Sequence, residues 1–273
     1  MKMKVKKYFE KLIAILRKPE MNILPANIAF YFVLALIPLF TIIIFLASSF
    51  SISADAIINI VNDIFPNAVS NTVISIITTE SVSSHINILL LIAFFVSTNG
   101  TRAIVVSSNQ LYKVEKTDKI RDRIKAIILL IIILMLLLFL ITVPILGRQI
   151  LELLKSITAL ENTIPKLILL YNGLKWPMTF LVIYFNLKLV YAISPSKQIE
   201  SVDTTEGAFF TTTCWVLATA LFSYYVNHFA RYDEIYGNLS TIIILMIWIY
   251  ALSYIFVLGM AINTLKYDKR KKE

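Results

Sequence analysis

The sequence has few of the residues on which soluble enzymes depend. Only 16% of its 273 residues are charged, whereas a soluble domain of this length carries about 25%. There are two histidines, His85 and His228, and a single cysteine, Cys214, which excludes an intrachain disulfide. The sequence contains no cluster with metal-ligand spacing, no glycine-rich phosphate loop and no nucleophile motif. It therefore predicts no enzymatic activity, no cofactor and no metal site.

The apolar runs of the sequence are long enough to cross a membrane. Hydrophobic residues make up 58% of the chain, and several runs exceed the roughly 20 residues that a bilayer requires. Glycine (6) and proline (8) are scarce, and the runs lack the alternation of a lipid-facing β-barrel. We therefore predict an all-α polytopic membrane protein with six transmembrane helices. The expected spans are Ile28–Phe50, Ile86–Val106, Ile127–Leu146, Leu174–Ile193, Gly207–Phe229 and Leu239–Leu265.

Positive charge alternates between the connections. Lys and Arg number seven in residues 1–20, six in residues 112–125 and five after Leu265, but none in residues 51–85. Because Lys and Arg accumulate on the cytoplasmic side of membrane proteins, both termini are predicted to be cytoplasmic, which an even number of spans requires. We expect a plasma-membrane location and contact with anionic lipid headgroups at the cytoplasmic face.

Amphipathic helices are expected outside the spans. In residues 1–20, apolar residues at helical spacing face away from lysines, which predicts an in-plane helix on the cytoplasmic leaflet or a helix docked on the spans. Two external connections carry similar apolar faces, one within residues 51–85 and one around Ile150, Leu153 and Leu154. Residues 266–273 form a basic tail.

Polar groups inside the spans are the best candidates for function, because they are costly in lipid. Asn99 and Gly100, in the stretch "STNGTR", could break the second helix, and Arg102 could donate two hydrogen bonds to a phosphate or carboxylate. The alternative is that Arg102 only reaches the headgroups. Lys188 is either a second anion contact or an interfacial lysine. Asn99, Arg102 and Lys188 are therefore the hypothetical substrate-binding residues.

Three stretches resemble the YihY/BrkB family of bacterial inner-membrane proteins, formerly labelled ribonuclease BN. They are "ANIAFYFVLALIPL", "STNGTRAIVVSSNQLYKVEK" and the block from "SPSKQI" to "IYGNLS". The resemblance covers nearly the whole chain and implies one membrane domain over residues 1–273. Ala261 departs from the pattern, because the family usually has Glu there. The main motif positions are Tyr31, Pro38, Asn109, Tyr112, Tyr236 and Gly237.

Three classes of function are compatible with these features. The leading hypothesis is a transporter or lipid-handling protein for an anionic or amphiphilic substrate. The second is a non-transporting envelope-assembly or structural protein that recruits partners through its basic face. The third and weakest is a tRNA-processing ribonuclease, for which the sequence offers no specific nucleic-acid site. A homo-oligomer is compatible with the sequence, which does not identify the substrate.

Overall fold

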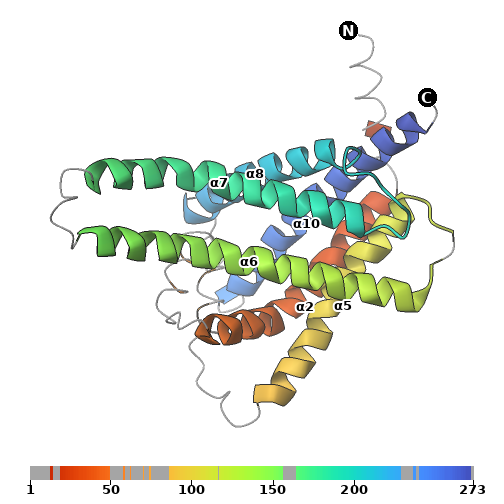
Figure 1. Ribbon diagram of the computed structural model, residues 1–273. Helices are drawn as coiled ribbons and strands as arrows, with labels where there is room; N and C mark the ends of the chain where they lie inside the picture. Colours follow the sequence, from red (N-terminus) through yellow and green to blue (C-terminus); the bar gives the residue numbers. More distant parts are fainter. Residues whose placement is uncertain are drawn as a thin grey trace, which may run out of the picture.

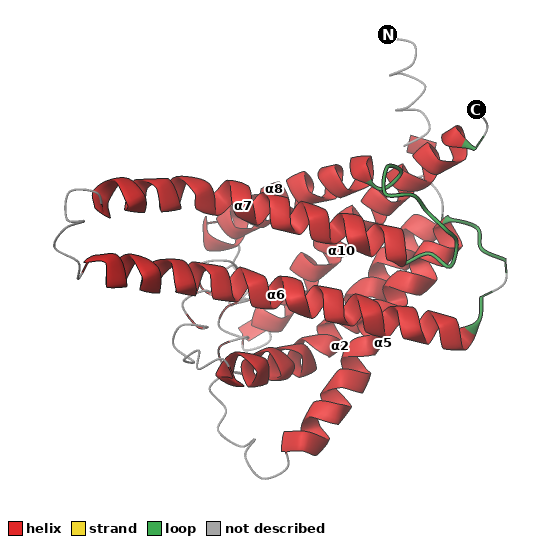
Figure 2. Cartoon of the chain, in the orientation of Figure 1, coloured by secondary structure: helices red, strands yellow, loops and turns green. Residues whose placement is uncertain are grey.

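The regular secondary structure in the described part of the chain is helical. The computed structural model describes residues 13–14, 19–49, 58, 62, 70, 74, 86–115, 117–155, 164–228, 236–237 and 240–271. These residues contain no β-strand (Figure 2), so the all-α prediction is confirmed. The long helices are α2 (Glu20–Ser49), α5 (Ile86–Leu111), α6 (Lys119–Lys155), α7 (Ile164–Ile193), α8 (Thr205–His228) and α10 (Ser240–Arg270).

Each predicted span falls on one of these helices. Five of them, α5, α6, α7, α8 and α10, are long and apolar enough to cross a membrane over their described residues. In α2 the corresponding described stretch is shorter, Glu20–Leu36. The six-span count and the cytoplasmic termini therefore stay predictions. Most of residues 1–20 and 51–85 lie outside the described residues, as do the amphipathic helices expected there.

Two local predictions are wrong because helices continue through the proposed boundaries. Helix α6 runs without interruption to Lys155, so Ile150, Leu153 and Leu154 continue this helix rather than form a separate one. Helix α5 is continuous through Asn99 and Gly100, so no helix break occurs there. Within a helix the backbone N–H and C=O groups bond to one another, so an uninterrupted helix leaves few of them unpaired in lipid. This favours a continuous helix over a broken one.

Gly100 serves packing between α5 and α2. A Cβ atom built on it would lie 3.6 Å from the Tyr31 carbonyl oxygen and 3.6 Å from Ala35 Cβ, both ordinary contact distances. Apolar attraction between helices is weak in lipid, so helix association depends on close van der Waals packing. The two helices are in contact at Gly100, and a Cβ atom would also fit there.

The helices pack in a closed sequence of neighbours. α2 packs on α5, α5 on α6, α6 on α7, α7 on α8, α8 on α10, and α10 returns to α2. α10 also contacts α5, and α2 contacts α6, so these four helices pack across the ring as well as around it. Figure 1 shows α6 and α7 running side by side in front of α2, α5 and α10. The buried core accordingly lies around α2, α5 and α10 rather than around α7.

The most closely packed crossing is that of α8 on α10. A Cβ atom on Gly207 would lie 2.1 Å from the Gly259 carbonyl oxygen, and one on Gly259 would lie 1.9 Å from Thr211 Oγ1. Real Cβ atoms essentially never approach other atoms so closely. The two glycines thus bring the helix backbones into contact, the arrangement that small residues permit in membrane bundles.

Polar bonds strengthen this crossing. The Gly207 N–H donates to Asn263 Oδ1 at 2.8 Å, so a side chain of α10 caps the first turn of α8. The Tyr191 hydroxyl of α7 donates to the Phe256 carbonyl at 2.8 Å and lies 2.7 Å from Thr211 Oγ1. Tyr191 is 1% exposed, and its hydroxyl group joins α7, α8 and α10 within the core.

We predict that Gly207→Ala and Gly259→Ala each destabilise the protein by roughly 1–3 kcal/mol or more, because the added methyl overpacks the α8–α10 crossing. Thermal unfolding in one detergent is the measurement. Gly173→Ala is the matched control, since nothing lies within 4 Å of a Cβ there. Its stability should stay level or rise, because alanine favours a helix over glycine by about 1 kcal/mol. Equal melting temperatures for all three variants would contradict the close crossing.

Candidate functional site

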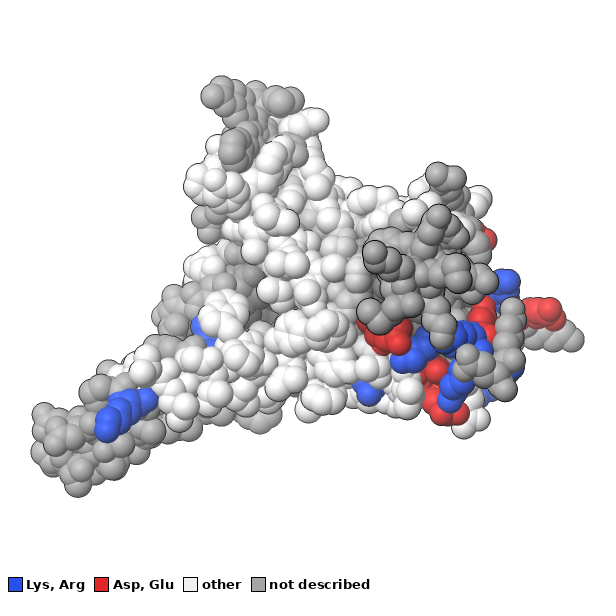
Figure 3. Space-filling view, turned by 90° about the horizontal axis from the view of Figure 1, so that it is seen from above, with Lys and Arg blue, Asp and Glu red and all other residues white. Residues whose placement is uncertain are grey.

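Charged side chains gather at one end of the molecule. Figure 3 shows most of the described acidic and basic residues at this end, beside a broad uncharged surface. We call it the charged end and define it by residues 109–115, 117–125, 194–204 and 266–271. It is the end that the Lys and Arg bias predicts to be cytoplasmic. Residues 266–270 of the predicted basic tail belong to α10.

The end of α5 positions two motif residues. The Val114 N–H donates to the Asn109 carbonyl at 2.9 Å, and the Lys113 N–H donates to the Gln110 carbonyl at 3.2 Å. Lys113 has a φ of 52°, so a lysine takes the left-handed position at which this type of helix end usually has glycine. The turn directs Asn109 and Tyr112 back into the protein, where they are 4% and 5% exposed.

Asn109 is the centre of a buried polar network that joins α5, α6 and the segment after α7. Its Nδ2 donates to Asp122 Oδ1 at 3.3 Å, and its Oδ1 accepts from the Ser196 N–H at 2.6 Å. Ser196 Oγ in turn donates to Asp122 Oδ1 at 2.7 Å. Lys125 Nζ donates to the Pro195 carbonyl next to it. The network ties together segments more than 70 residues apart.

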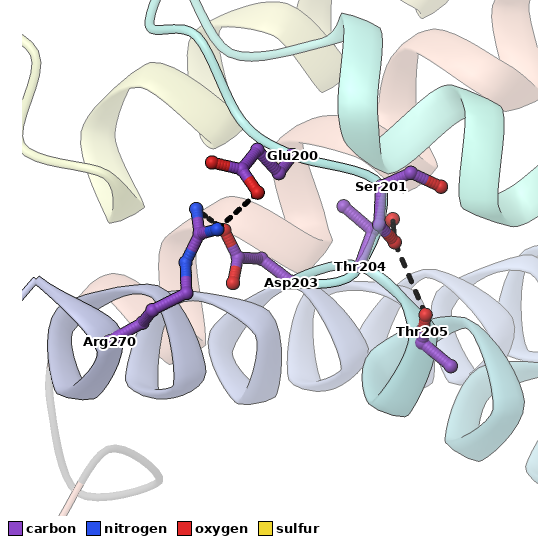
Figure 4. Close-up of polar contacts among 6 residues, drawn as sticks. All are labelled: Glu200, Ser201, Asp203, Thr204, Thr205 and Arg270. Carbon is purple, nitrogen blue, oxygen red and sulfur yellow. Dashed lines mark hydrogen bonds and ion pairs between the residues drawn. The ribbon is translucent and has the colours of Figure 1, made fainter.

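A second polar contact fastens the end of α10 to the α7–α8 connection (Figure 4). Arg270 Nη2 pairs with Asp203 Oδ2 at 2.7 Å, and Arg270 Nη1 pairs with Glu200. The Asp203 side chain is fully buried, whereas that of Glu200 is 66% exposed. Pairing is therefore essential for Asp203, because an unpaired buried carboxylate is costly, and matters little for Glu200.

Tyr112 completes the packing between these contacts. Its ring meets that of Tyr267 edge-on, with centroids 5.8 Å apart. Burial raises the pKa of Tyr112 above its usual range, and the nearby Asp203 carboxylate raises it further, so the hydroxyl keeps its proton. Tyr112 is therefore a neutral packing group at physiological pH.

The charged end is consequently better suited to holding the helices than to chemistry. The donors and acceptors of Asn109, Asp122 and Ser196 are directed at one another, which leaves little capacity for a ligand. Among the described residues, no group of three or more His, Cys, Asp or Glu could hold a metal ion.

A different arrangement occurs inside the span of α5. Arg123 of α6 donates from Nη1 to Asn99 Oδ1 at 3.0 Å, and its guanidinium lies 5.9 Å from the Phe95 ring centroid. Leu111, the end of α5, follows Asn99 by twelve positions, which corresponds to about 18 Å of helix. Arg123 is the fifth residue of α6, at the charged end, and its guanidinium reaches along the helix surface to the middle of α5 rather than to its end.

The electrostatics of Arg123 are unusual for this location. Among the described residues it has no carboxylate partner, only a neutral amide and an aromatic face. A guanidinium carries five N–H donors, and one of them is engaged here. Charged groups inside a membrane usually have a counter-charge or a functional reason to be there. Arg123 is thus a candidate binding group.

The predicted substrate-binding residues are only partly brought together. Asn99 is half-buried and Arg102, one turn away on α5, is exposed, so both lie on the helix face that Arg123 reaches. Lys188 is half-buried on α7, and α6 lies between α5 and α7 in the ring. Lys188 and Arg102 therefore do not form one site through neighbouring helices.

The remaining motif residues lie in packing contacts, within a helix or at a turn. Tyr31 packs edge-on against Phe30, with ring centroids 5.3 Å apart, and Pro38 lies within α2. Tyr236 is exposed, and Gly237 has a φ of 51°, which glycine adopts without strain before α10 begins. These positions support turns and packing rather than a binding site.

Sequence reasoning missed Arg123, Asp122, Asp203 and Arg270. Each appears in the sequence as one more charge in a charged segment, and their partners are 13 to 74 residues away. The one available signal was the position of Asp122 and Arg123 on a helix that becomes apolar within one turn. Such residues must either pair or reach along the helix surface.

We predict that Asp122→Ala destabilises the protein by about 1–3 kcal/mol, because Asn109 Nδ2 and Ser196 Oγ lose their common acceptor. Asp122→Asn should cost less, since the amide oxygen still accepts. Glu115→Ala, in the connection just before α6 and exposed, is the control and should have no measurable effect. Thermal unfolding in detergent gives the comparison. An Asp122→Ala variant as stable as Glu115→Ala would show that the network does not hold the helix ends.

Comparison with known proteins agrees with the resemblance noted above. The chain is 30% identical over 251 residues to the putative ribonuclease-like protein YfkH of Bacillus subtilis, covering 90% of each protein. It is also 37% identical over 81 residues to a UPF0761 membrane protein of Idiomarina loihiensis, covering 30% of this chain and 28% of that protein. No solved structure matches the chain. A model of the family described as virulence factor BrkB matches residues 14–273, and the chain is therefore a membrane protein of this family.

Proposed function

We propose that the protein is a transporter or lipid-handling protein of the plasma membrane, with an anionic or amphiphilic substrate. The observation that carries the proposal is the Arg123 guanidinium beside Asn99 and Phe95, inside the α5 span and without a carboxylate partner among the described residues. A charge placed there without a local counter-charge is stabilised when an anion passes or binds.

The packing of the helices is consistent with this proposal. In the α5 span 56% of the residues are buried inside the protein, against 11% in the α8 span. α5 is therefore a central helix, yet it carries a run of polar side chains, "STNGTR", at positions where lipid-facing and core-facing helices are normally apolar. A polar strip on a central helix is the feature that an anion crossing the membrane requires.

The proposal treats the chain as non-enzymatic. The printed name of YfkH raises ribonuclease activity as an alternative. Recruitment of partners by the charged end is the other alternative, and it follows from the gathering of charge in Figure 3. Both differ from transport in a measurable way, since neither requires movement of a solute or lipid across a bilayer.

The test is movement of a fluorescent anionic lipid, or of a small anion, across vesicles that contain the purified protein. We expect protein-dependent movement, and we expect Arg102→Ala to lower it by about tenfold, the effect of losing about 1.4 kcal/mol of charged hydrogen bonding. Lys188→Ala tests the second predicted contact. Lys166→Ala is the control, because this exposed lysine lies near the start of α7, within its first turn.

Three results would count against the proposal or its residues. If Arg102→Ala and Lys188→Ala both leave movement unchanged, those residues are not the substrate contacts. If the wild-type protein moves nothing but crosslinks a stable partner, the assembly function is favoured. Metal-dependent cleavage of RNA by the purified protein would favour the ribonuclease.

A further inference from the structure

The lipid-facing side of α5 carries a row of residues that suits an amphiphile. Phe95, Asn99, Arg102 and Val106 follow each other at intervals of three or four residues and so share one helix face. Phe95 is 60% exposed and Val106 is 42% exposed. The face thus has a polar middle between two exposed apolar side chains.

Helix α6 supplies the rest of this surface. Arg123 extends from α6 to α5, where it bonds to Asn99 and stacks on Phe95. Beyond Arg123, exposed apolar side chains continue along α6 at Ile124, Ile128 and Ile131. The two helices are held together beneath this surface by Thr101 Oγ1, which donates to the Ala126 carbonyl at 2.6 Å.

The charge of the surface is unbalanced. Arg102 has no hydrogen-bond or ion-pair partner among the described residues, and Arg123 has no acidic one. Arg102 follows Asn99 by one turn of α5, and Arg123 bonds to Asn99 from α6. The two guanidiniums together offer up to nine uncommitted N–H donors, counting about five per guanidinium. Planar guanidiniums bind phosphate through paired hydrogen bonds, which single lysines do not match.

From this geometry we infer that Arg102 and Arg123 bind the phosphate of an anionic phospholipid, with its acyl chains along the exposed apolar side chains of α5 and α6. The inference rests on the proposed function, because it names the substrate class and places the headgroup on the outer α5–α6 surface. It differs from passage through the interior of the helix ring, where Tyr191, Leu129 and Val105 fill the core.

Asn99 has a positioning role in this site. Its Oδ1 accepts from Arg123 and fixes the direction of the guanidinium, while the Phe95 ring supports the cation's other face. Without these contacts the arginine side chain would extend toward the headgroup region, as long basic side chains do near helix ends. The bound phosphate then completes the charge balance that the protein leaves open.

The experiment measures lipid binding rather than movement. Purified protein in nanodiscs of neutral lipid is titrated with phosphatidylglycerol, and with diacylglycerol of the same chains, and retained lipid is counted by native mass spectrometry. We expect retention of phosphatidylglycerol only, weakened about tenfold by Arg123→Gln and by Arg102→Gln. Lys166→Gln is the control, since this exposed lysine lies in the first turn of α7, outside the α5–α6 surface.

Further arms separate the explanations. Arg123→Lys should recover part of the binding if charge suffices and little if paired hydrogen bonds are required. Arg102→Gln removes no contact within the described residues, so it keeps the test valid if the Arg123 variants fold poorly. Inorganic phosphate at millimolar concentration should not displace the lipid, because it lacks the apolar contacts.

Specific outcomes overturn the inference. Equal retention by Arg123→Gln, Arg102→Gln and Lys166→Gln would show that the two arginines do not bind the phosphate. Binding of inorganic phosphate as tight as that of the lipid would make the ligand a soluble anion. If the protein retains the lipid but transports nothing, the binding site stands and the proposed function is refuted. If the protein transports its substrate but the arginine variants retain as much lipid as the wild type, the proposed function stands and the binding site is refuted.

Discussion

The close crossing of α8 and α10 determines the geometry of the charged end. Gly207 and Gly259 bring the two backbones into contact, and Asn263 caps the first turn of α8 from α10. Once this crossing is fixed, the last turn of α10 lies beside the α7–α8 connection, where Arg270 reaches the buried Asp203. Because lipid supplies little hydrophobic driving force, such backbone contact contributes more to this fold than apolar burial does.

Polar groups in this protein fall into two kinds. At the charged end, Asn109, Asp122 and Ser196 satisfy one another and join three segments. Beside the α5 span, Arg123 and Arg102 keep donors that no described residue accepts. The first kind stabilises a single arrangement of helices, and the second kind retains the capacity to bind an anion. The distinction rests on hydrogen-bond satisfaction and not on the number of polar residues.

The ring of helices allows both kinds to coexist. α2, α5 and α10 make the buried core, while α7 and α8 leave many large apolar side chains exposed, which lipid accommodates. A central helix with a polar strip can therefore reach the lipid along its junction with α6, without a water-filled channel through the bundle. The fold thus places charge where a lipid headgroup could meet it from the side.

The sequence by itself determined the helical class, the apolar stretches on which the long helices lie, and the family. Long apolar runs can satisfy their backbone only as helices in a membrane, so composition and run length were sufficient. They also singled out Asn99 and Arg102, since polar residues in such runs are few. The predicted break at Gly100 failed because glycine only weakens a helix, and packing against α2 offsets that cost.

The tertiary structure alone decided which polar residues act together. Asn109 with Ser196, Asp203 with Arg270, and Gly207 with Asn263 are separated by 87, 67 and 56 residues. Nothing in local periodicity relates such pairs, because each depends on how two helices cross. Arg123 is the clearest case: in the sequence it is one of several basic residues before a span. The crossing of α5 and α6 turns it toward Asn99, where the charge has a neutral partner.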